Sequence, residues 1–291
     1  MLRFLTASLL PVALLASGCA RHVGKPDGPP PQRLAHDWTV QRDLPFTPDD
    51  WPQPLLADLY RPSGPAPATG WPAVVLIHGG GWSGGDRAQV EGLARRIARR
   101  GYVTLNVTYR LAPAAIFPAQ VLDVQQAVAW LRGRAGDYGV DGSRIAAWGY
   151  SAGAHLAAML GGLGDGDRLY RPEAGVRALV AGGIPSDLRK FRGGTIVPTF
   201  LGERWRADSV PFREASPAAY VAPGDPPVFL YHGGWDQLVP FDQASDYKAA
   251  LDAAGVPNEL YELRGLGHIT AFLMDGEAVQ RGLDFLDRHL R

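Results

Sequence analysis

From about residue 36 onward, short apolar runs alternate with segments of helical spacing, and this alternation limits the fold more than any other feature of the chain. A strand–helix–strand order is typical of a mostly parallel sheet with helices on both faces. Two early apolar runs are followed by proline-containing loops, so we expect them to form an antiparallel edge. The sequence therefore predicts a single α/β fold over residues 36–291. We expect strands near residues 38–42, 55–60, 73–77, 102–108, 144–148, 179–184, 228–232 and 259–263, and helices near 86–100, 118–134, 152–160, 241–254 and 270–289.

One region, residues 185–220, breaks the alternation. It carries Phe191, Phe200, Trp205 and Phe212 among glycine, proline and arginine residues, without a clear period. Two interpretations are open: the segment is a surface excursion whose aromatic side chains pack on the sheet, or it is a small cap that lines a substrate pocket.

The N-terminus has the features of an export signal. Arg3 supplies a positive charge, residues 4–16 form an apolar run too short to span a bilayer comfortably, and small residues precede Cys19. This ending resembles the bacterial lipobox, with Ala16 in place of the usual leucine. The resemblance implies a lipoprotein-type signal peptide over residues 1–18, acylation of Cys19 and a place in the bacterial cell envelope, with the outer membrane favoured. A plain signal peptide with an incidental cysteine and an uncleaved anchor are the alternatives.

Residues 19–35 are rich in proline and contain almost nothing that could be buried. Such a stretch stays extended. We therefore expect it to act as a tether that holds a folded domain away from a membrane surface. Cys19 is also the one cysteine of the chain, so no internal disulfide can form.

The charges of the chain balance, with 29 Lys and Arg residues against 29 Asp and Glu residues. No net field then draws the protein to nucleic acid or to an anionic membrane surface. A nucleic-acid partner is therefore not expected, and membrane contact is expected only through an N-terminal lipid anchor. No pattern in the sequence indicates an oligomeric state.

The segment Gly149-Tyr150-Ser151-Ala152-Gly153 matches the pattern G-x-S-x-G between an expected strand and an expected helix. A nucleophile on a tight strand-to-helix turn needs glycine two positions away on each side, because backbone segments approach closely there. Ser151 is therefore the predicted nucleophile. The alternative is that this serine only caps the following helix.

A glycine-rich loop, His-Gly-Gly-Gly-Trp at residues 78–82, directly follows the first buried strand. Acyl transfer places negative charge on the former carbonyl oxygen, and each N–H group aimed at it stabilises the transition state by about 3 kcal/mol. We predict that the N–H groups of Gly80, Gly81 and Ala152 form this oxyanion hole. A phosphate-binding loop is the alternative, but the Gly-Lys-Ser/Thr ending is missing. His78 is expected to support the loop.

A serine hydroxyl needs a base that works near ambient pH, and histidine is the natural choice. His268 lies just past the final expected strand, in a loop that can reach the Ser151 turn. It is therefore the predicted base, and His232 is expected to support the loop that follows it. The remaining histidines lie in the tether, ahead of the core, on the Ser151 helix or at the C-terminus; they are His22, His36, His155 and His289.

A carboxylate must hold the neutral imidazole in one tautomer and stabilise the imidazolium that forms. Asp236 follows the expected strand at residues 228–232 and completes the chain order serine, acid, histidine that such turns use. Asp225 lies before that strand, and Asp242 begins the next helix, where a carboxylate has a simple dipole role. Asp236 is therefore the predicted acid.

Together these motifs resemble the HGGG-type bacterial carboxylesterases of the α/β-hydrolase superfamily, in the branch of feruloyl and acetylxylan esterases, kynurenine formamidase and hormone-sensitive-lipase-like enzymes. The likeness covers residues 55–291 and includes Tyr-Arg-Leu-Ala-Pro at 109–113 and Phe-Pro at 117–118. It implies an α/β-hydrolase fold in which the serine, aspartate and histidine above form a catalytic triad. The long N-terminal cap of the lipase-like branch is not evident, which argues against large lipid substrates.

The resemblance also implies a two-step acyl transfer through an acyl-enzyme, without a metal or organic cofactor. The expected substrates are small-molecule or glycan esters with small or carbohydrate-linked acyl groups. An amidase, formamidase or peptidase with the same triad is the alternative among enzymes, because a triad does not encode which acyl derivative is cut. A tethered binding protein on an inactive hydrolase scaffold is the alternative outside enzymes.

Overall fold

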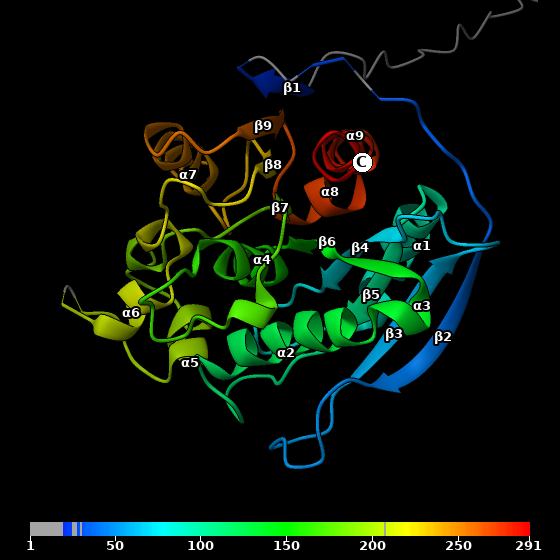
Figure 1. The fold of residues 1–291 in the computed structure, drawn as a ribbon. Helices are drawn as coiled ribbons and strands as arrows, with labels where there is room; N and C mark the ends of the chain where they lie inside the picture. The colour runs from blue at the N-terminus through cyan, green and yellow to red at the C-terminus, as the bar shows by residue number, and fades with distance from the viewer. Residues whose placement is uncertain (1–19, 25–27, 30, 207) are drawn as a thin grey trace, which may run out of the picture.

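The computed structural model describes residues 20–24, 28–29, 31–206 and 208–291. Within these ranges the strands form one nine-stranded sheet in the order β1-β9-β8-β7-β6-β4-β5-β3-β2 (Figure 1). Pairing is parallel from β5 through β4, β6, β7 and β8 to β9, and antiparallel where β1, β3 and β2 are added at the edges. The predicted mostly parallel sheet is confirmed. The strands are β1 Ala20–Val23, β2 Trp38–Pro45, β3 Leu56–Pro62, β4 Trp71–Ile77, β5 Val103–Val107, β6 Val140–Tyr150, β7 Leu179–Gly182, β8 Val228–Gly233 and β9 Asn258–Leu263.

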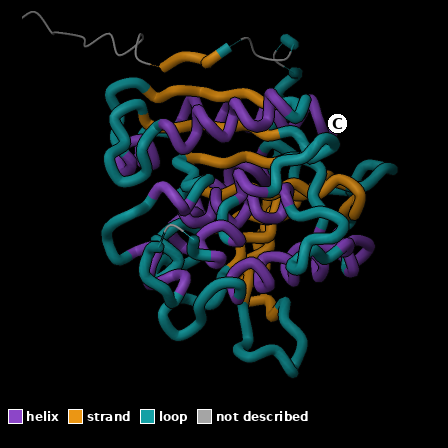
Figure 2. The backbone as a smooth tube through the Cα atoms, turned by 90° about the vertical axis from the view of Figure 1, so that its left-hand side faces the viewer, coloured by secondary structure: helices purple, strands orange, loops and turns teal. Residues whose placement is uncertain are grey.

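Helices cover both faces of this sheet (Figure 1 and Figure 2). One face packs against α1 and α9 through side chains such as Ile97 and Leu283, and the other packs against α2, α4 and α7 through side chains such as Val124 and Leu251. A parallel strand covered on both faces needs apolar residues at every position, and all seven residues of β4 are buried. The helices are α1 Glu91–Arg99, α2 Ala119–Gly133, α3 Ala135–Tyr138, α4 Ala152–Gly162, α5 Ile196–Leu201, α6 Val210–Glu214, α7 Asp242–Ala253, α8 His268–Leu273 and α9 Gly276–Leu290.

The predicted helix at residues 270–289 is two helices. α8 ends at Leu273 and α9 begins at Gly276, with Met274 and Asp275 between them. Apolar spacing did not reveal this break, because Ala271 and Ala278 keep helical spacing across it and are both fully buried. The separation lets the short helix α8 pack beside β8 independently of α9.

The predicted tether at residues 19–35 is wrong for Ala20–Val23. These residues form β1, which pairs antiparallel with β9 so that its first residue lies opposite Leu263. A short, largely polar segment gives no strand signal by itself; here the edge of β9 provides partners for its backbone N–H and C=O groups. The predicted signal peptide at residues 1–18 and Cys19 lie outside the described residues. In the part described, no helix has the length and apolarity needed to cross a bilayer.

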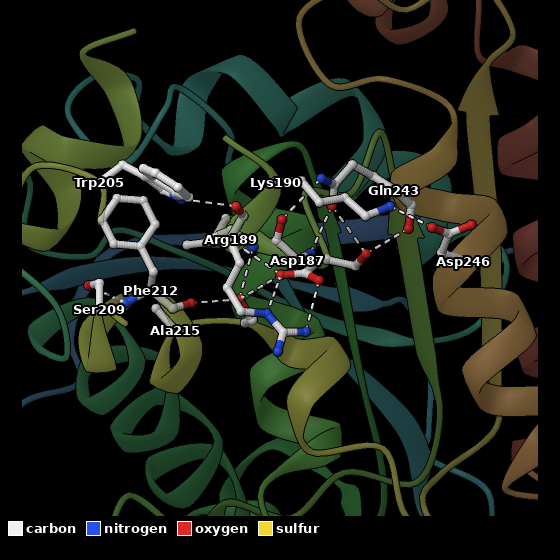
Figure 3. Close-up of polar contacts among 12 residues, drawn as sticks. Asp187, Arg189, Lys190, Trp205, Ser209, Phe212, Ala215, Gln243 and Asp246 are labelled. Atoms are coloured by element: carbon white, nitrogen blue, oxygen red, sulfur yellow. Dashed lines mark hydrogen bonds and ion pairs between the residues drawn. The ribbon is translucent and has the colours of Figure 1, made fainter. Parts of the chain in front are cut away.

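Residues 185–220 form an insert of short helices and turns that is fixed to the body of the protein. The Gln243 side-chain amide of α7 donates to the Asp187 carbonyl and accepts the Asp187 N–H (Figure 3). Lys190 Nζ reaches Asp246 Oδ2 of the same helix at 2.5 Å. These contacts join the first residues of the insert to α7. The insert therefore has a defined position relative to the sheet.

Candidate active site

Ser151 occupies the turn between β6 and α4, as the G-x-S-x-G pattern predicts. Its backbone has φ 55° and ψ −121°, a strained conformation for any residue other than glycine. The cause is steric: a Cβ on Gly149 would lie 2.1 Å from Gly153 C, and a Cβ on Gly153 would lie 2.1 Å from Ile77 O. The Ser151 N–H also donates to Gly182 O at 2.7 Å. Close backbone packing therefore fixes this serine at the carboxyl edge of the sheet.

The glycine-rich loop after β4 lies against the same turn. A Cβ on Gly79 would meet Tyr150 O at 3.0 Å and Ser151 Cβ at 3.5 Å. Gly80 has φ 110°, and a Cβ there would lie 2.1 Å from Gly84 O, so only glycine fits. The loop can approach the serine this closely because it carries no side chains on that side.

Gly80, Gly81 and Ala152, the residues predicted for the oxyanion hole, lie in this loop and at the start of α4. Within the described ranges, the N–H groups of these three residues have no backbone acceptor. For Ala152 the reason is its place as the first residue of α4, where an N–H has no intrahelical partner. Tyr109 supports the loop from behind: its ring stacks on His78 and its hydroxyl donates to the His78 carbonyl at 3.2 Å. The three N–H groups thus remain able to bind an oxyanion.

Asp236 and His268 form a direct pair. His268 Nδ1 lies 2.6 Å from Asp236 Oδ2, with 6% of the histidine side chain and 0% of the aspartate side chain exposed. A carboxylate only accepts hydrogen bonds, so Nδ1 carries the proton and Nε2 is the basic nitrogen of the neutral ring. The other carboxylate oxygen accepts the N–H groups of Leu238 at 3.0 Å and Val239 at 2.8 Å. Both oxygens of the Asp236 carboxylate therefore accept hydrogen bonds, which fix its orientation.

A second histidine, His232 at the end of β8, also contacts this carboxylate. Its Nε2 lies 2.8 Å from Val239 O and 3.4 Å from Asp236 Oδ2, and the side chain is completely buried. Because a carbonyl only accepts, Nε2 carries the proton and shares it between these two oxygens. Burial raises the pKa of Asp236, but hydrogen bonds from His232, His268 and the Val239 N–H outweigh burial and hold that pKa well below its usual value. Asp236 is thus a carboxylate at neutral pH.

Ser151 and His268 border the same bend after β7. A Cβ on Gly183 would lie 3.0 Å from His268 Cε1, and the preceding Gly182 carbonyl accepts the Ser151 N–H. Tyr150 donates its hydroxyl to the His268 carbonyl at 2.7 Å. Among the described residues, no hydrogen bond joins Ser151 Oγ to the imidazole; such contacts often tighten only when substrate binds. Sequence reasoning missed the role of Tyr150, because it occupies a variable position of the motif.

The insert touches the glycine-rich loop from the outside. A Cβ on Gly81 would lie 3.1 Å from Ile196 Cγ2, at the start of α5. His155 of α4 joins the loop to the insert, because its Nδ1 accepts the Trp82 indole N–H at 3.2 Å and its Nε2 donates to Ala215 O at 2.6 Å. Burial lowers the pKa of His155 to about 4, so this ring is neutral at pH 7. No pattern in the sequence indicates this structural role.

A cavity of about 530 Å³ lies within the insert, between residues 192–195 and 198–205. Its walls do not include Ser151, Asp236 or His268. Cavity volume therefore does not locate the candidate active site, which is defined instead by the strained turn and the buried aspartate–histidine pair.

The sheet order, the serine on a strand-to-helix turn and the aspartate–histidine pair after later strands define the chain as an α/β-hydrolase fold protein. The sequence profile of the BD-FAE family matches residues 57–251, which is more than half of the chain. The chain belongs to this family.

Curated relatives and solved structures agree with this assignment. Esterase LipQ of Mycobacterium tuberculosis is 31% identical over 75% of this chain and 54% of its own length, and esterase LipC of the same organism is 34% identical over 81% and 61%. The chain thus spans little more than half the length of these relatives. The apo form of Thermogutta terrifontis esterase 2 is 27% identical, with a TM-score of 0.72 over 89% of this chain and 96% of that one. Another structure of that esterase is described as phosphoramylated by tabun, and it is 26% identical with a TM-score of 0.71.

Proposed function

We propose that this protein is a serine carboxylic ester hydrolase that cleaves small or carbohydrate-linked acyl esters through an acyl-enzyme on Ser151. The observation that carries the proposal is the buried 2.6 Å contact between His268 Nδ1 and Asp236 Oδ2, next to a serine held at φ 55°. An imidazole bound to a carboxylate in this way can take a proton from a hydroxyl. Membership of the BD-FAE family and the relatives named esterases support the same class of reaction.

In the first step of the proposed mechanism, Ser151 Oγ attacks the ester carbonyl carbon and His268 Nε2 takes the hydroxyl proton. The carbonyl oxygen becomes an oxyanion, which the three N–H groups predicted for the oxyanion hole stabilise. The ester C–O bond then breaks, and the alcohol leaves with the proton from the imidazolium, a cation that Asp236 stabilises. In the second step, water attacks the acyl-enzyme, its proton passes through His268 to the serine oxygen, and the carboxylic acid leaves.

The insert at residues 185–220 is proposed to line the substrate pocket as a small cap. Support comes from Ile196, which reaches Gly81 in the glycine-rich loop, and from His155, which fixes the insert to that loop. Ile196 thus lies beside Gly81, a residue predicted for the oxyanion hole, and its side chain is proposed to limit the space for the acyl group. This favours esters whose acyl group is small.

The chain is further proposed to be exported and held in the bacterial cell envelope through acylated Cys19. The apolar run at residues 4–16 and the small residues before the cysteine support this. The mass of the N-terminal peptide from full-length protein made in bacteria tests it. Acylation and loss of residues 1–18 are expected in the wild type and not in Cys19→Ser, whereas an unmodified, uncleaved wild-type N-terminus would contradict the proposal.

Hydrolysis of p-nitrophenyl acetate by the wild type and by Ser151→Ala tests the central claim. Loss of the nucleophile is expected to lower kcat by more than about 10³-fold, and a phosphonate probe should label only the wild type. Ser63→Ala, at an exposed serine away from the turn, is the matched control and should keep full activity. Turnover retained by Ser151→Ala would disprove the mechanism, and a matched anilide assayed in parallel separates esterase from amidase activity.

A further inference from the structure

The described chain begins at the same edge of the sheet that carries the candidate active site. In the antiparallel pairing of β1 with β9, Ala20 lies opposite Leu263, the last residue of β9. β9 is parallel to β8, so Leu263 lies beside Gly233, the last residue of β8. Asp236 follows the end of β8, and His268 follows the end of β9. β1 therefore starts at the carboxyl edge of the sheet (Figure 1 shows β1 along β9).

Exposed apolar side chains are concentrated at this edge. Of the nine large apolar side chains that are exposed in the described residues, five lie in two short segments, residues 235–238 and 269–274. The segments adjoin, because the Trp235 N–H donates to Leu266 O at 3.0 Å, just before α8. We call these five side chains the apolar rim: they are Trp235 (73% exposed), Leu238 (49%), Ile269 (62%), Leu273 (72%) and Met274 (64%).

The rim is not part of the protein core. Ile269 and Leu273 are four positions apart on α8, so they lie on one face of that helix. His268 and Ala271 of the same helix are buried, so the face with Ile269 and Leu273 is turned to solvent. Single exposed apolar residues need no explanation, but a group of five beside a site marks an interaction surface. A tryptophan among aliphatic side chains is typical of a surface that meets a bilayer.

Two guanidinium groups lie close to the rim: Arg21 is on β1, and Arg264 directly follows β9, where a Cβ on Gly234, next to Trp235, would lie 3.5 Å from Arg264 Cα. Arg21 Nε is 2.8 Å and Arg264 Nε is 3.6 Å from the same oxygen, Glu262 Oε2. The arginine side chains are 56% and 45% exposed. One carboxylate against two guanidinium groups leaves a net positive charge here. This local charge suits anionic lipid headgroups, although the chain as a whole has no net charge.

We propose that the apolar rim and these two arginines dock on a lipid bilayer, so that the active-site edge faces the membrane and the substrates are amphipathic esters presented at its surface. The substrate part of this inference rests on the proposed ester hydrolysis. A lipid at the end of a chain holds a protein at a bilayer, and an apolar surface that enters the interface adds binding strength in proportion to the apolar area it buries. Because β1 begins at Ala20, a lipid on Cys19 would be one residue from the sheet, and the rim would be brought to the same surface. This extends the expectation of a lipid anchor alone.

Turnover of two esters with the same acyl group tests the orientation. One ester is water-soluble, and the other has a long alkyl alcohol that partitions into vesicles of phosphatidylethanolamine and phosphatidylglycerol. For full-length protein on such vesicles, the double variant Leu273→Ser, Met274→Ser is expected to lose about tenfold on the vesicle-borne ester and less than about twofold on the soluble one. Leu34→Ser, at an apolar residue ahead of β2 that is 41% exposed and lies outside the insert, is the matched control and should change neither rate.

Two results would overturn the docking proposal: unchanged rates on both esters in the double variant, or an equal fall on both. The second result would assign the rim to the binding of soluble substrate. Failure of the wild type to hydrolyse either ester would instead contradict the proposed function, so the two failures are distinguishable.

Trp235 provides a second measurement that does not depend on activity. Vesicles with brominated acyl chains quench tryptophan emission only within the bilayer, and the chain has eight tryptophans, so wild type must be compared with Trp235→Phe. We expect a quenched component that is present in the wild type and absent from the variant. Equal quenching in both proteins, or none in either, would show that this edge does not enter the bilayer.

Discussion

The nucleophile turn, residues 149–153, and the acid–base pair, Asp236 and His268, are positioned by different forces. The turn is fixed by backbone packing, because its two glycines have no room for a Cβ atom. The pair is fixed by hydrogen bonds between buried polar groups, to which His232 contributes. The first region should therefore be sensitive to added volume, and the second to the loss of single hydrogen bonds.

The largest effect is expected from Gly153→Ala. The added Cβ would lie 2.1 Å from Ile77 O, and backbone cannot move aside as a flexible side chain can. We expect no measurable ester hydrolysis, with reduced yield of folded protein, as checked by p-nitrophenyl acetate turnover and circular dichroism. Gly92→Ala in α1 is the matched control: a Cβ there has nothing within 4 Å, so stability should be unchanged or should rise by about 0.5–1 kcal/mol. Full activity of Gly153→Ala would show that backbone packing at this glycine does not fix the nucleophile turn.

Asp236→Asn tests the acid–base pair with almost no change in volume. The amide can donate to the ring nitrogen and so favours the wrong tautomer of His268. We expect kcat to fall by about 10³- to 10⁴-fold with KM nearly unchanged, while thermal unfolding shows that the fold persists. A fall in kcat of less than tenfold would mean that the carboxylate does not orient the base.

The region of the nucleophile turn also depends on one ionisable side chain, because His155 lies on α4, the helix that follows the turn. Its pKa in the folded protein is lowered to about 4, below the unfolded value of about 6.5. The unfolded chain therefore binds more protons between these values, and stability is lost as pH falls from about 6.5 to about 4. The loss is expected to be about 3 kcal/mol. Urea unfolding of wild type and His155→Gln across this range measures it, and an identical pH dependence in both would assign the loss to other groups.

The smallest effect is expected at His232. His232→Leu removes the N–H shared between Val239 O and Asp236 Oδ2, whereas His232→Gln keeps a donor. We expect kcat to fall by about tenfold in the leucine variant, as for the loss of one hydrogen bond to a charged group, and to recover in part in the glutamine variant. Steady-state kinetics with KM unchanged would show a positioning role. Equal rates in the two variants would show that only the packing of the ring matters.

The nucleophile turn could be predicted because its signal is local: a strand, two glycines around a serine, and a helix are adjacent in the sequence. The contact of Asp236 with His268 followed from chain order, and their catalytic roles stay predictions. Contacts between segments that are distant in the sequence have no such local signal. The hydrogen bond from the Tyr150 hydroxyl to the His268 carbonyl is an example. The segment Ala20–Val23 was misjudged for a related reason, because it takes its structure from the edge of β9 and not from its own residues.

The pairing of β1 with β9 has a consequence for shortened forms of the protein. A chain that begins after Val23 would leave Asn258–Leu263 as a bare edge strand, with a row of unpaired N–H and C=O groups. Such an edge is a template for strand addition by a second copy. Removal of the N-terminal segment, by proteolysis or to ease purification, should therefore increase self-association of the protein through the exposed edge of β9.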